Sequence, residues 1–170
     1  MSQGLPAPGH LAHEFATWLW WKSEMNAARF DLGDPVGVVD IWVDERLAFR
    51  HRDETRVAAL MTGDSPSATL EARAALAGGK WVAELRVGVR RDDREFMITL
   101  KGPELHFAAV KLPVVVADGG AEVLWDRMHL LTEISWIVGA AYRQFAARRT
   151  ASTWASEDLP AVRRWMAGEG

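Results

Sequence analysis

The sequence has 170 residues, of which 49% are apolar and 25% charged, and this composition predicts a globular domain and excludes a disordered tail. Cysteine is absent, which excludes a disulfide framework, a thiolate zinc site, an iron–sulfur cluster and a cysteine nucleophile. No apolar run approaches the ~20 residues of a membrane span, and the opening segment lacks the layout of a signal peptide. We therefore expect a cytoplasmic protein that makes no membrane contact.

The first segment divides into a lead-in and a helix. Residues 1–10 are rich in Gly and Pro and predict a flexible lead-in, and residues 11–170 then form a single α+β domain. Apolar residues at helical spacing predict a helix from Leu11 to about Arg29. Alternation of apolar and polar residues predicts two strands, over 36–44 and 46–51, and a third over 55–62.

The middle of the chain predicts a second helix and three further strands. Asp64, Ser65 and Pro66 favour a helix start, and Gly78-Gly79 favours its end. Alternation resumes over 81–90, with one side facing a core and the other facing water. A polar hairpin loop at residues 91–94 precedes strands over 96–100 and 105–111.

The last third predicts two helices. From about Gly120 to Arg149 a stripe of apolar residues favours a long helix that packs centrally against the sheet. The stripe consists of Leu124, Leu131, Val138 and Phe145, which stand seven apart, widened by Met128, Ile134, Ile137 and Ala141. A polar break at 150–158 precedes a short helix that begins at Leu159-Pro160 and ends near Gly168. The order is α-βββ-α-βββ-α-α, so we expect an antiparallel sheet of about six strands packed against the long helix.

Two patterns could carry metal chemistry, and each has a simpler explanation. His10, His13 and Glu14 have partial helical metal-site spacing, but exposed histidines at a helix start explain them better. Asp40 and Asp44 on one strand, with Glu84 and Arg86 on another, resemble the layout of a magnesium-dependent nuclease. A solvated, ion-paired sheet face is the favoured alternative, so we predict no catalytic residue, metal or cofactor and regard enzymatic activity as the minority interpretation.

The distribution of charge offers one candidate binding surface. Of the 20 basic residues 16 are Arg, a bias that genome composition alone can produce. Residues 143–170 nevertheless carry five Arg against three acids, whereas residues 1–45 carry two basic and seven acidic side chains. Guanidinium groups bind phosphates well, although Arg148 and Arg149 could equally complement the negative end of the long helix.

The stretch Trp18-Leu19-Trp20-Trp21 is the most unusual part of the chain, which contains nine Trp in all. Successive helical residues are ~100° apart, so the three indoles cannot all point into one core. At least one must therefore contact a second packing layer, another subunit or a ligand such as a base. We take Trp18, Trp20 and Trp21 as candidate interface residues for a homo-oligomer or a protein partner.

Several blocks of the sequence resemble the bacterial recombination-associated RdgC family, in particular its short, divergent members. The blocks are Glu14-Phe15-Ala16-Thr17-Trp18-Leu19-Trp20-Trp21-Lys22-Ser23-Glu24, residues 70–76 with Gly79-Lys80, residues 96–100, residues 111–113 and residues 149–154. The resemblance runs from about residue 11 to 165 and implies a non-enzymatic, sequence-independent DNA-binding protein that forms ring-like dimers around duplex DNA and restrains recombination.

Three functional hypotheses follow, from different classes. The first is an RdgC-like DNA-binding accessory protein, associated with the nucleoid, whose candidate contacts are chosen by charge. These are Arg90, Arg91, Arg148, Arg149, Arg163 and Arg164. The second is a protein–protein adaptor or oligomer subunit that uses residues 18–21, and the third is the magnesium-dependent nuclease. The first two are distinguished by whether the arginines share one surface and whether the indoles are exposed.

Overall fold

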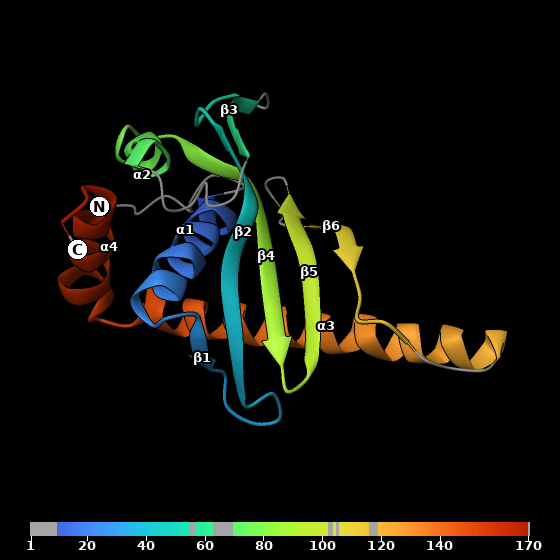
Figure 1. The fold of residues 1–170 in the computed structure, drawn as a ribbon. Helices are drawn as coiled ribbons and strands as arrows, with labels where there is room; N and C mark the ends of the chain where they lie inside the picture. Colours follow the sequence, from blue (N-terminus) through green and yellow to red (C-terminus); the bar gives the residue numbers. More distant parts are fainter. Residues whose placement is uncertain are drawn as a thin grey trace.

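The computed structural model describes residues 10–54, 57–62, 70–101, 104, 106–115 and 119–169, which form an antiparallel sheet with helices on one face (Figure 1). The elements in chain order are α1 (His10–Met25), β1 (Arg29–Asp31), β2 (Val38–Arg50), β3 (Val57–Thr62), α2 (Leu70–Ala77), β4 (Trp81–Arg91), β5 (Arg94–Lys101), β6 (His106–Lys111), α3 (Gly120–Thr150), the π-helical turn η2 (Trp154–Asp158) and α4 (Leu159–Met166). The predicted α+β class and element order are confirmed.

The sheet has the strand order β1-β2-β4-β5-β6, and β3 pairs with β2 away from this path. Every pairing is antiparallel. The strands predicted separately over 36–44 and 46–51 are in fact one strand of 13 residues, β2, with a register shift between Val43 and Leu47. A bulge of this kind inserts extra residues without ending a strand.

The sixth strand is β1, which was not predicted; the predicted first helix extended to about Arg29, where this strand begins. That helix ends at Met25 instead of Arg29, because Ala27 and Ala28 take positive φ values of 48° and 65° and turn the chain toward the sheet. The Ala28 N–H donates to the Ser23 carbonyl and closes the helix end. The predicted start of the second helix at 64–66 lies outside the described residues, whereas its predicted end is confirmed by Gly79, at φ +84°.

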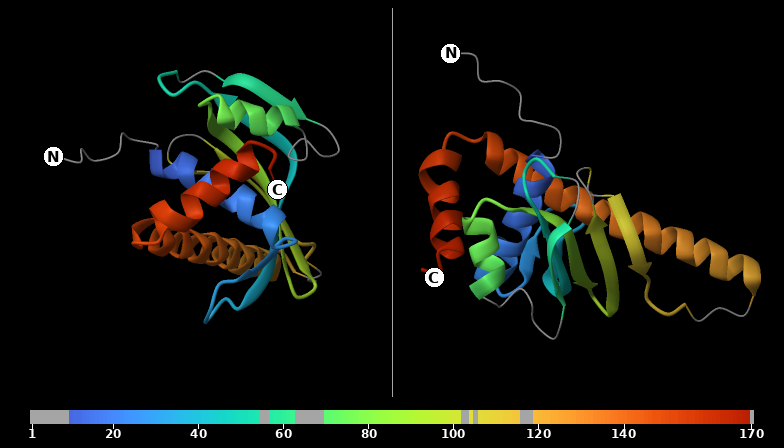
Figure 2. Two further views of the ribbon diagram at one scale, coloured as in Figure 1. Left: turned by 90° about the vertical axis from the view of Figure 1, so that its left-hand side faces the viewer. Right: turned by 90° about the horizontal axis from the view of Figure 1, so that it is seen from above.

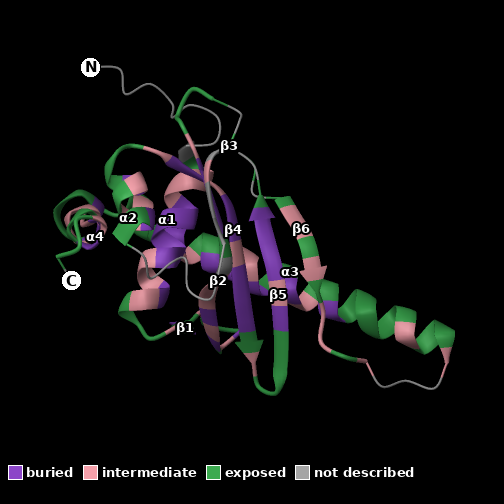
Figure 3. Cartoon of the chain, turned by 45° about the horizontal axis from the view of Figure 1, so that its top comes forward, coloured by how far each residue is buried: buried purple, intermediate pink, exposed green. Residues whose placement is uncertain are grey.

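The core lies between the sheet and the two helices α1 and α3, which cover the same face (Figure 2). The alternation of β4 and β5 places Leu85, Val87 and Ile98 on this face, and all three are buried. Figure 3 shows the buried residues concentrated along β2, β4, β5 and α1. The prediction that one side of the strand over 81–90 faces a core is therefore confirmed.

Helix α1 is enclosed on more than one side, which explains its unusual indoles. Trp18 packs against Phe145 of α3 and Phe30 of β1, with ring centroids 5.7 and 6.4 Å apart. Trp20 points to another side, where its ring meets Trp165 of α4 edge-on at 4.8 Å. Helix α4 is thus the second packing layer that the spacing of these residues required.

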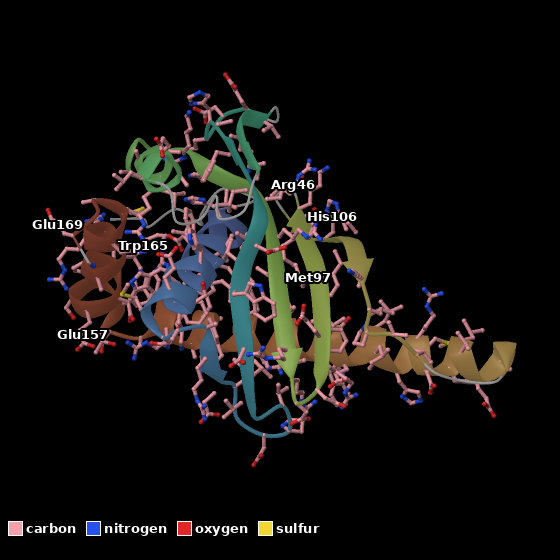
Figure 4. All side chains as sticks on the ribbon, in the orientation of Figure 1. Arg46, Met97, His106, Glu157, Trp165 and Glu169 are labelled. Atoms are coloured by element: carbon pink, nitrogen blue, oxygen red, sulfur yellow. The ribbon has the colours of Figure 1, made fainter. Side chains whose placement is uncertain are left out.

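A single carboxylate, Glu24, ties α1 to α2 and α4. Its Oε1 accepts the indole N–H of Trp20 at 2.7 Å, and its Oε2 accepts that of Trp165 at 2.7 Å. Arg73 of α2 donates to the same Oε2 at 2.8 Å. Three donors from three helices therefore converge on one side chain, and Figure 4 shows Trp165 pointing from α4 into this junction.

Helix α3 packs on the sheet with part of the predicted stripe, since Ile134, Ile137, Ala141 and Phe145 are buried as predicted. Its core side consists of Leu130, Ile134, Ile137, Ala140, Ala141 and Phe145. Leu124 and Leu131, which the sequence analysis assigned to the core, are instead 61% and 42% exposed. The outer half of the helix extends past β6, where no described strand covers it (Figure 1). Within the described ranges, no helix has both the length and the apolar content needed to cross a bilayer.

Candidate nucleic-acid interface

The face of the sheet opposite α1 and α3 carries a band of charged side chains. No helix in the described part of the chain covers it (Figures 1 and 2). Cross-strand register places Arg29 beside Asp40, Asp40 beside Arg90, and Lys111 beside Met97 on this side. We call it the open sheet face; among the described residues its basic side chains are Arg29, Arg46, Arg86, Arg90, Lys101 and Lys111, and its acidic ones are Asp31, Asp40, Asp44, Glu84 and Glu95.

Ion pairs between neighbouring strands organise this face. Arg90 donates to Asp40 Oδ2 from Nη2 at 2.6 Å and from Nε at 3.2 Å, and Arg86 lies 3.5 Å from Asp44. Glu84, only 5% exposed, lies between Arg46 and Lys101. A buried carboxylate needs such partners, so Arg46 and Lys101 have a structural role as well as a surface position. Figure 4 labels Arg46, Met97 and His106, which come from three strands of the face.

An indole lies in the middle of the open sheet face. Trp42 of β2 stands directly opposite Gly88 of β4, and a Cβ built on Gly88 would overlap the indole. The guanidinium of Arg90 lies 6.0 Å from the centre of the Trp42 ring. Glycine thus leaves room for the ring to lie flat on the strand, and the cation beside it gives the face an aromatic surface next to a positive charge.

The carboxylates considered for a magnesium site do not converge. Asp40, Asp44 and Glu84 each pair with a different arginine, and the described residues contain no group of three or more metal-binding side chains. The favoured alternative, an ion-paired sheet face, is what the structure has. His13 and Glu14 are likewise engaged elsewhere: the Val82 N–H donates to His13 Nδ1 at 3.0 Å, and Arg149 donates to Glu14 at 2.7 Å.

The six arginines chosen by charge lie in three separate places instead of one surface. Arg90 is on the open sheet face, 2.6 Å from Asp40. Arg91, near the β4–β5 turn, points to the other side and lies 3.2 Å from Glu133 of α3, which also pairs with Arg94 at 2.6 Å. Arg90 and Arg91 lie on different sides of the sheet because successive residues along a strand face opposite sides.

The other four arginines belong to the C-terminal helices. Arg148 pairs with Asp158 at 2.8 Å and Arg149 with Glu14 at 2.7 Å. Arg163 and Arg164 are exposed on α4, and in the described part of the chain their side chains make no ion pair. Four basic residues of the open sheet face were not predicted from the sequence, because their shared face depends on pairing between distant strands: Arg29, Arg46, Lys101 and Lys111.

The candidate interface indoles are largely internal. Trp18 is 2% and Trp20 0% exposed, so neither offers a surface to a partner, and only Trp21 is partly exposed. The interface prediction for Trp18 and Trp20 is corrected by their packing against α3, α4 and the sheet. The most exposed indoles in the described chain are Trp125 and Trp136 of α3, at 62% and 60%.

Charged groups from α1, α3 and η2 meet near the end of α3. The Lys22 ammonium donates to Gln144 at 2.8 Å and lies 4.9 Å from the centre of the Trp18 ring. Burial lowers the pKa of Lys22, and the nearby Arg148 lowers it further, while Asp158 opposes the shift. A hydrogen bond from Arg148 to Asp158 raises the pKa of the arginine. Arg148 is therefore engaged within the fold.

Removing this arginine is expected to affect stability. Arg148→Ala should lower the free energy of unfolding by about 1–2 kcal/mol, because it leaves the carboxylate of Asp158, 5% exposed, without its ion-pair partner. Thermal unfolding should show a decrease in Tm of roughly 2–8 °C. Arg163→Ala is the control and should leave Tm unchanged. If the double variant Arg148→Ala/Asp158→Asn is no more stable than Arg148→Ala alone, the explanation by an unpaired carboxylate is wrong.

Comparison with known proteins yields no match for this chain among family models, curated proteins or solved structures.

Proposed function

We propose that this chain is a non-enzymatic protein that binds DNA without sequence preference, through the open sheet face. The observation that carries the proposal is the row of basic side chains on a sheet face that no described helix covers. In the described residues this face has six basic groups and five acidic ones, with the Trp42 indole among them. Phosphate contacts supply most of the affinity in sequence-independent binding.

The arrangement supports a backbone contact more than a readout of bases. Four of the basic groups, Arg46, Arg86, Arg90 and Lys101, already pair with carboxylates, so phosphates compete with protein acids for them. Arg29 and Lys111 are exposed and make no ion pair in the described part of the chain. Binding should therefore be weak at high salt, as expected for a chain of net charge -3.

The resemblance to the RdgC family supports a biological role for such binding. Within this proposal, the protein acts at the nucleoid of a bacterial cytoplasm as an accessory factor that restrains recombination. Sequence-independent coverage of DNA suits that role, because an accessory factor of this kind must act at any site.

A matched pair of charge variants tests which surface binds. The double variant Arg29→Gln/Lys111→Gln removes two unpaired cations from the open sheet face, and Arg163→Gln/Arg164→Gln removes two from α4. In gel shifts and salt titrations, the first should weaken duplex binding about tenfold or more and reduce the slope of log K against log salt by about 2. The second should bind like the unmodified protein.

Each other outcome has a definite meaning. If only the α4 variant loses binding, the contact lies on α4 and the assignment to the sheet face is wrong. If the unmodified protein retards neither duplex nor single-stranded DNA at low salt, the proposed function itself is wrong. Both variants remove exposed side chains, so circular dichroism should show the same fold for each.

A further inference from the structure

The outer half of α3 presents an apolar stripe that the fold leaves open. Its members lie at successive spacings of four and three residues, which align them along one side of a helix. We call this stripe the α3 seam: Leu124, Met128, Leu131, Ser135, Val138 and Tyr142. Leu124 is 61% exposed and Met128 is 49% exposed. Figure 3 shows the outer part of α3 mainly in the colour of exposed residues.

Nothing within the described chain accounts for so much exposed apolar surface on one helix. The core stripe of α3, represented by Leu130 and Ile137, lies about 100° around the helix from the seam. A helical segment without tertiary contacts is only marginally stable in water, and a contiguous exposed apolar patch marks an interaction surface. The seam therefore calls for a partner.

The other end of the same seam borders a pocket. Its volume is about 460 Å³, and Val138, Gly139 and Tyr142 of α3 form one wall. Phe15 of α1 and Phe107 of β6 are among the residues that line the remainder. The helix thus carries exposed apolar side chains at one end and an apolar pocket at the other.

We propose that α3 pairs with α3 of a second copy of this chain, in antiparallel orientation about a two-fold axis. The intervals between successive seam residues are the same from either end of the seam. A single antiparallel register therefore places every seam residue opposite a seam residue of the second copy. Leu124 then lies opposite Tyr142 of the partner subunit, and Leu131 lies opposite Ser135 of the partner subunit. This self-complementarity is what an isologous interface requires.

The pocket is the reason to assign a second copy of the chain as the partner of the seam. In the antiparallel register, Leu124 and Met128 of each chain lie opposite Tyr142 and Val138 of the partner subunit, which line its pocket, and the same contact occurs twice. Leu124 is 61% and Met128 49% exposed, so both have apolar area to bury in that pocket. Arg127 lies opposite Gly139 of the partner subunit, so no like charges meet across the seam.

The contact length is adequate for a stable dimer. From residue 124 to residue 142 the helix runs about 27 Å, and each copy adds the walls of its pocket to the contact. A specific dimer buries roughly 800 Å² per partner, which a helix pair of this length with two filled pockets can supply. The inference does not depend on DNA binding, so the failure of either proposal leaves the other standing.

Light scattering tests the proposal directly. The unmodified chain should be a dimer, and Leu131→Glu should be a monomer of unchanged helix content, because it places two carboxylates near the two-fold axis. Trp136→Glu is the control: it alters a more exposed apolar residue of α3, 60% against 42% for Leu131, about 140° around the helix, and it should remain a dimer. A monomeric unmodified protein, or a dimer that Leu131→Glu leaves intact, would overturn the proposal.

Disulfide crosslinking tests the orientation, since the chain has no cysteine of its own. A mixture of Leu124→Cys and Tyr142→Cys proteins should form covalent dimers on oxidation, whereas neither variant should do so alone. The antiparallel register brings residues 124 and 142 of different copies together and holds two copies of residue 124 apart. Crosslinking by Leu124→Cys alone, or none in the mixture, would contradict the antiparallel arrangement.

Discussion

Replacement of Glu24 by alanine is expected to destabilise the fold by about 3–5 kcal/mol. The Glu24 carboxylate accepts the indole N–H groups of Trp20 and Trp165 and a guanidinium N–H of Arg73. Both indoles are almost fully buried, so their N–H groups lose their only acceptor among the described residues when the carboxylate is removed. An unsatisfied buried donor costs about 1–3 kcal/mol, and a charged one more.

Urea denaturation would measure this loss, and two variants control for it. Glu71→Ala changes an exposed glutamate on α2, so its free energy of unfolding should stay within about 0.5 kcal/mol of the unmodified value. Glu24→Gln keeps an acceptor oxygen but brings an amide N–H₂ toward donors, so it should fall between the two. If Glu24→Ala unfolds at the same urea concentration as Glu71→Ala, the three hydrogen bonds do not hold the helices together.

The second large effect is expected at Gly88, where a methyl group has no space. Gly88→Ala should lower the free energy of unfolding by about 1–3 kcal/mol, the usual range for overpacking. The added Cβ would overlap the indole of Trp42, which lies flat on the strand. The ring must therefore leave its position, and it takes with it the contact to Arg90.

A double-mutant cycle isolates this clash. In a Trp42→Ala background the indole is absent, so the cost of Gly88→Ala should disappear, and the alanine can even favour the strand. Equilibrium unfolding of the four proteins gives the coupling energy. If Gly88→Ala lowers the free energy of unfolding equally in both backgrounds, the glycine is needed for its backbone conformation and not to make room for the indole.

The strand and helix order was predictable because it depends on local patterns. The period of two over 81–90 and the helical spacing after Leu11 appear within a few turns of chain, and both elements formed. Strand β1 was missed because its three residues, Arg29–Asp31, become a strand only by pairing with Val38–Asp40. Such a short segment carries no period of its own.

The spacing of the apolar residues in α3 did not predict which of them pack against the sheet. The seven-residue spacing of Leu124, Leu131 and Val138 correctly indicates a helix. A helix can carry apolar residues over a wide part of its surface, however, and the neighbouring elements decide which of them are buried. Here the sheet covers Leu130, Ile134 and the residues that follow them. The predicted residues Ile134, Ile137, Ala141 and Phe145 are in the core. Leu124, Met128 and Leu131, predicted with them, instead belong to the seam for which we propose a second copy.

The charged surface was the least predictable part. Arg149 pairs with Glu14, which lies 135 residues away in the sequence, and Arg91 pairs with Glu133. Counting arginines along the chain cannot reveal which of them a distant carboxylate neutralises. The open sheet face is likewise assembled from strands whose register only the folded chain defines.

The junction at Glu24 also constrains when the protein can fold during its synthesis. Glu24 and Trp165 are separated by 141 residues, so the carboxylate leaves the ribosome long before its last donor is made. At the usual rates of translation this interval lasts roughly 7–28 s. Throughout it α1 lacks the cover of α4, and the ring of Trp20 stays open to water and to other nascent chains. The packing of α4 against α1 therefore comes late, and we expect chaperone binding to α1 to fall within this interval.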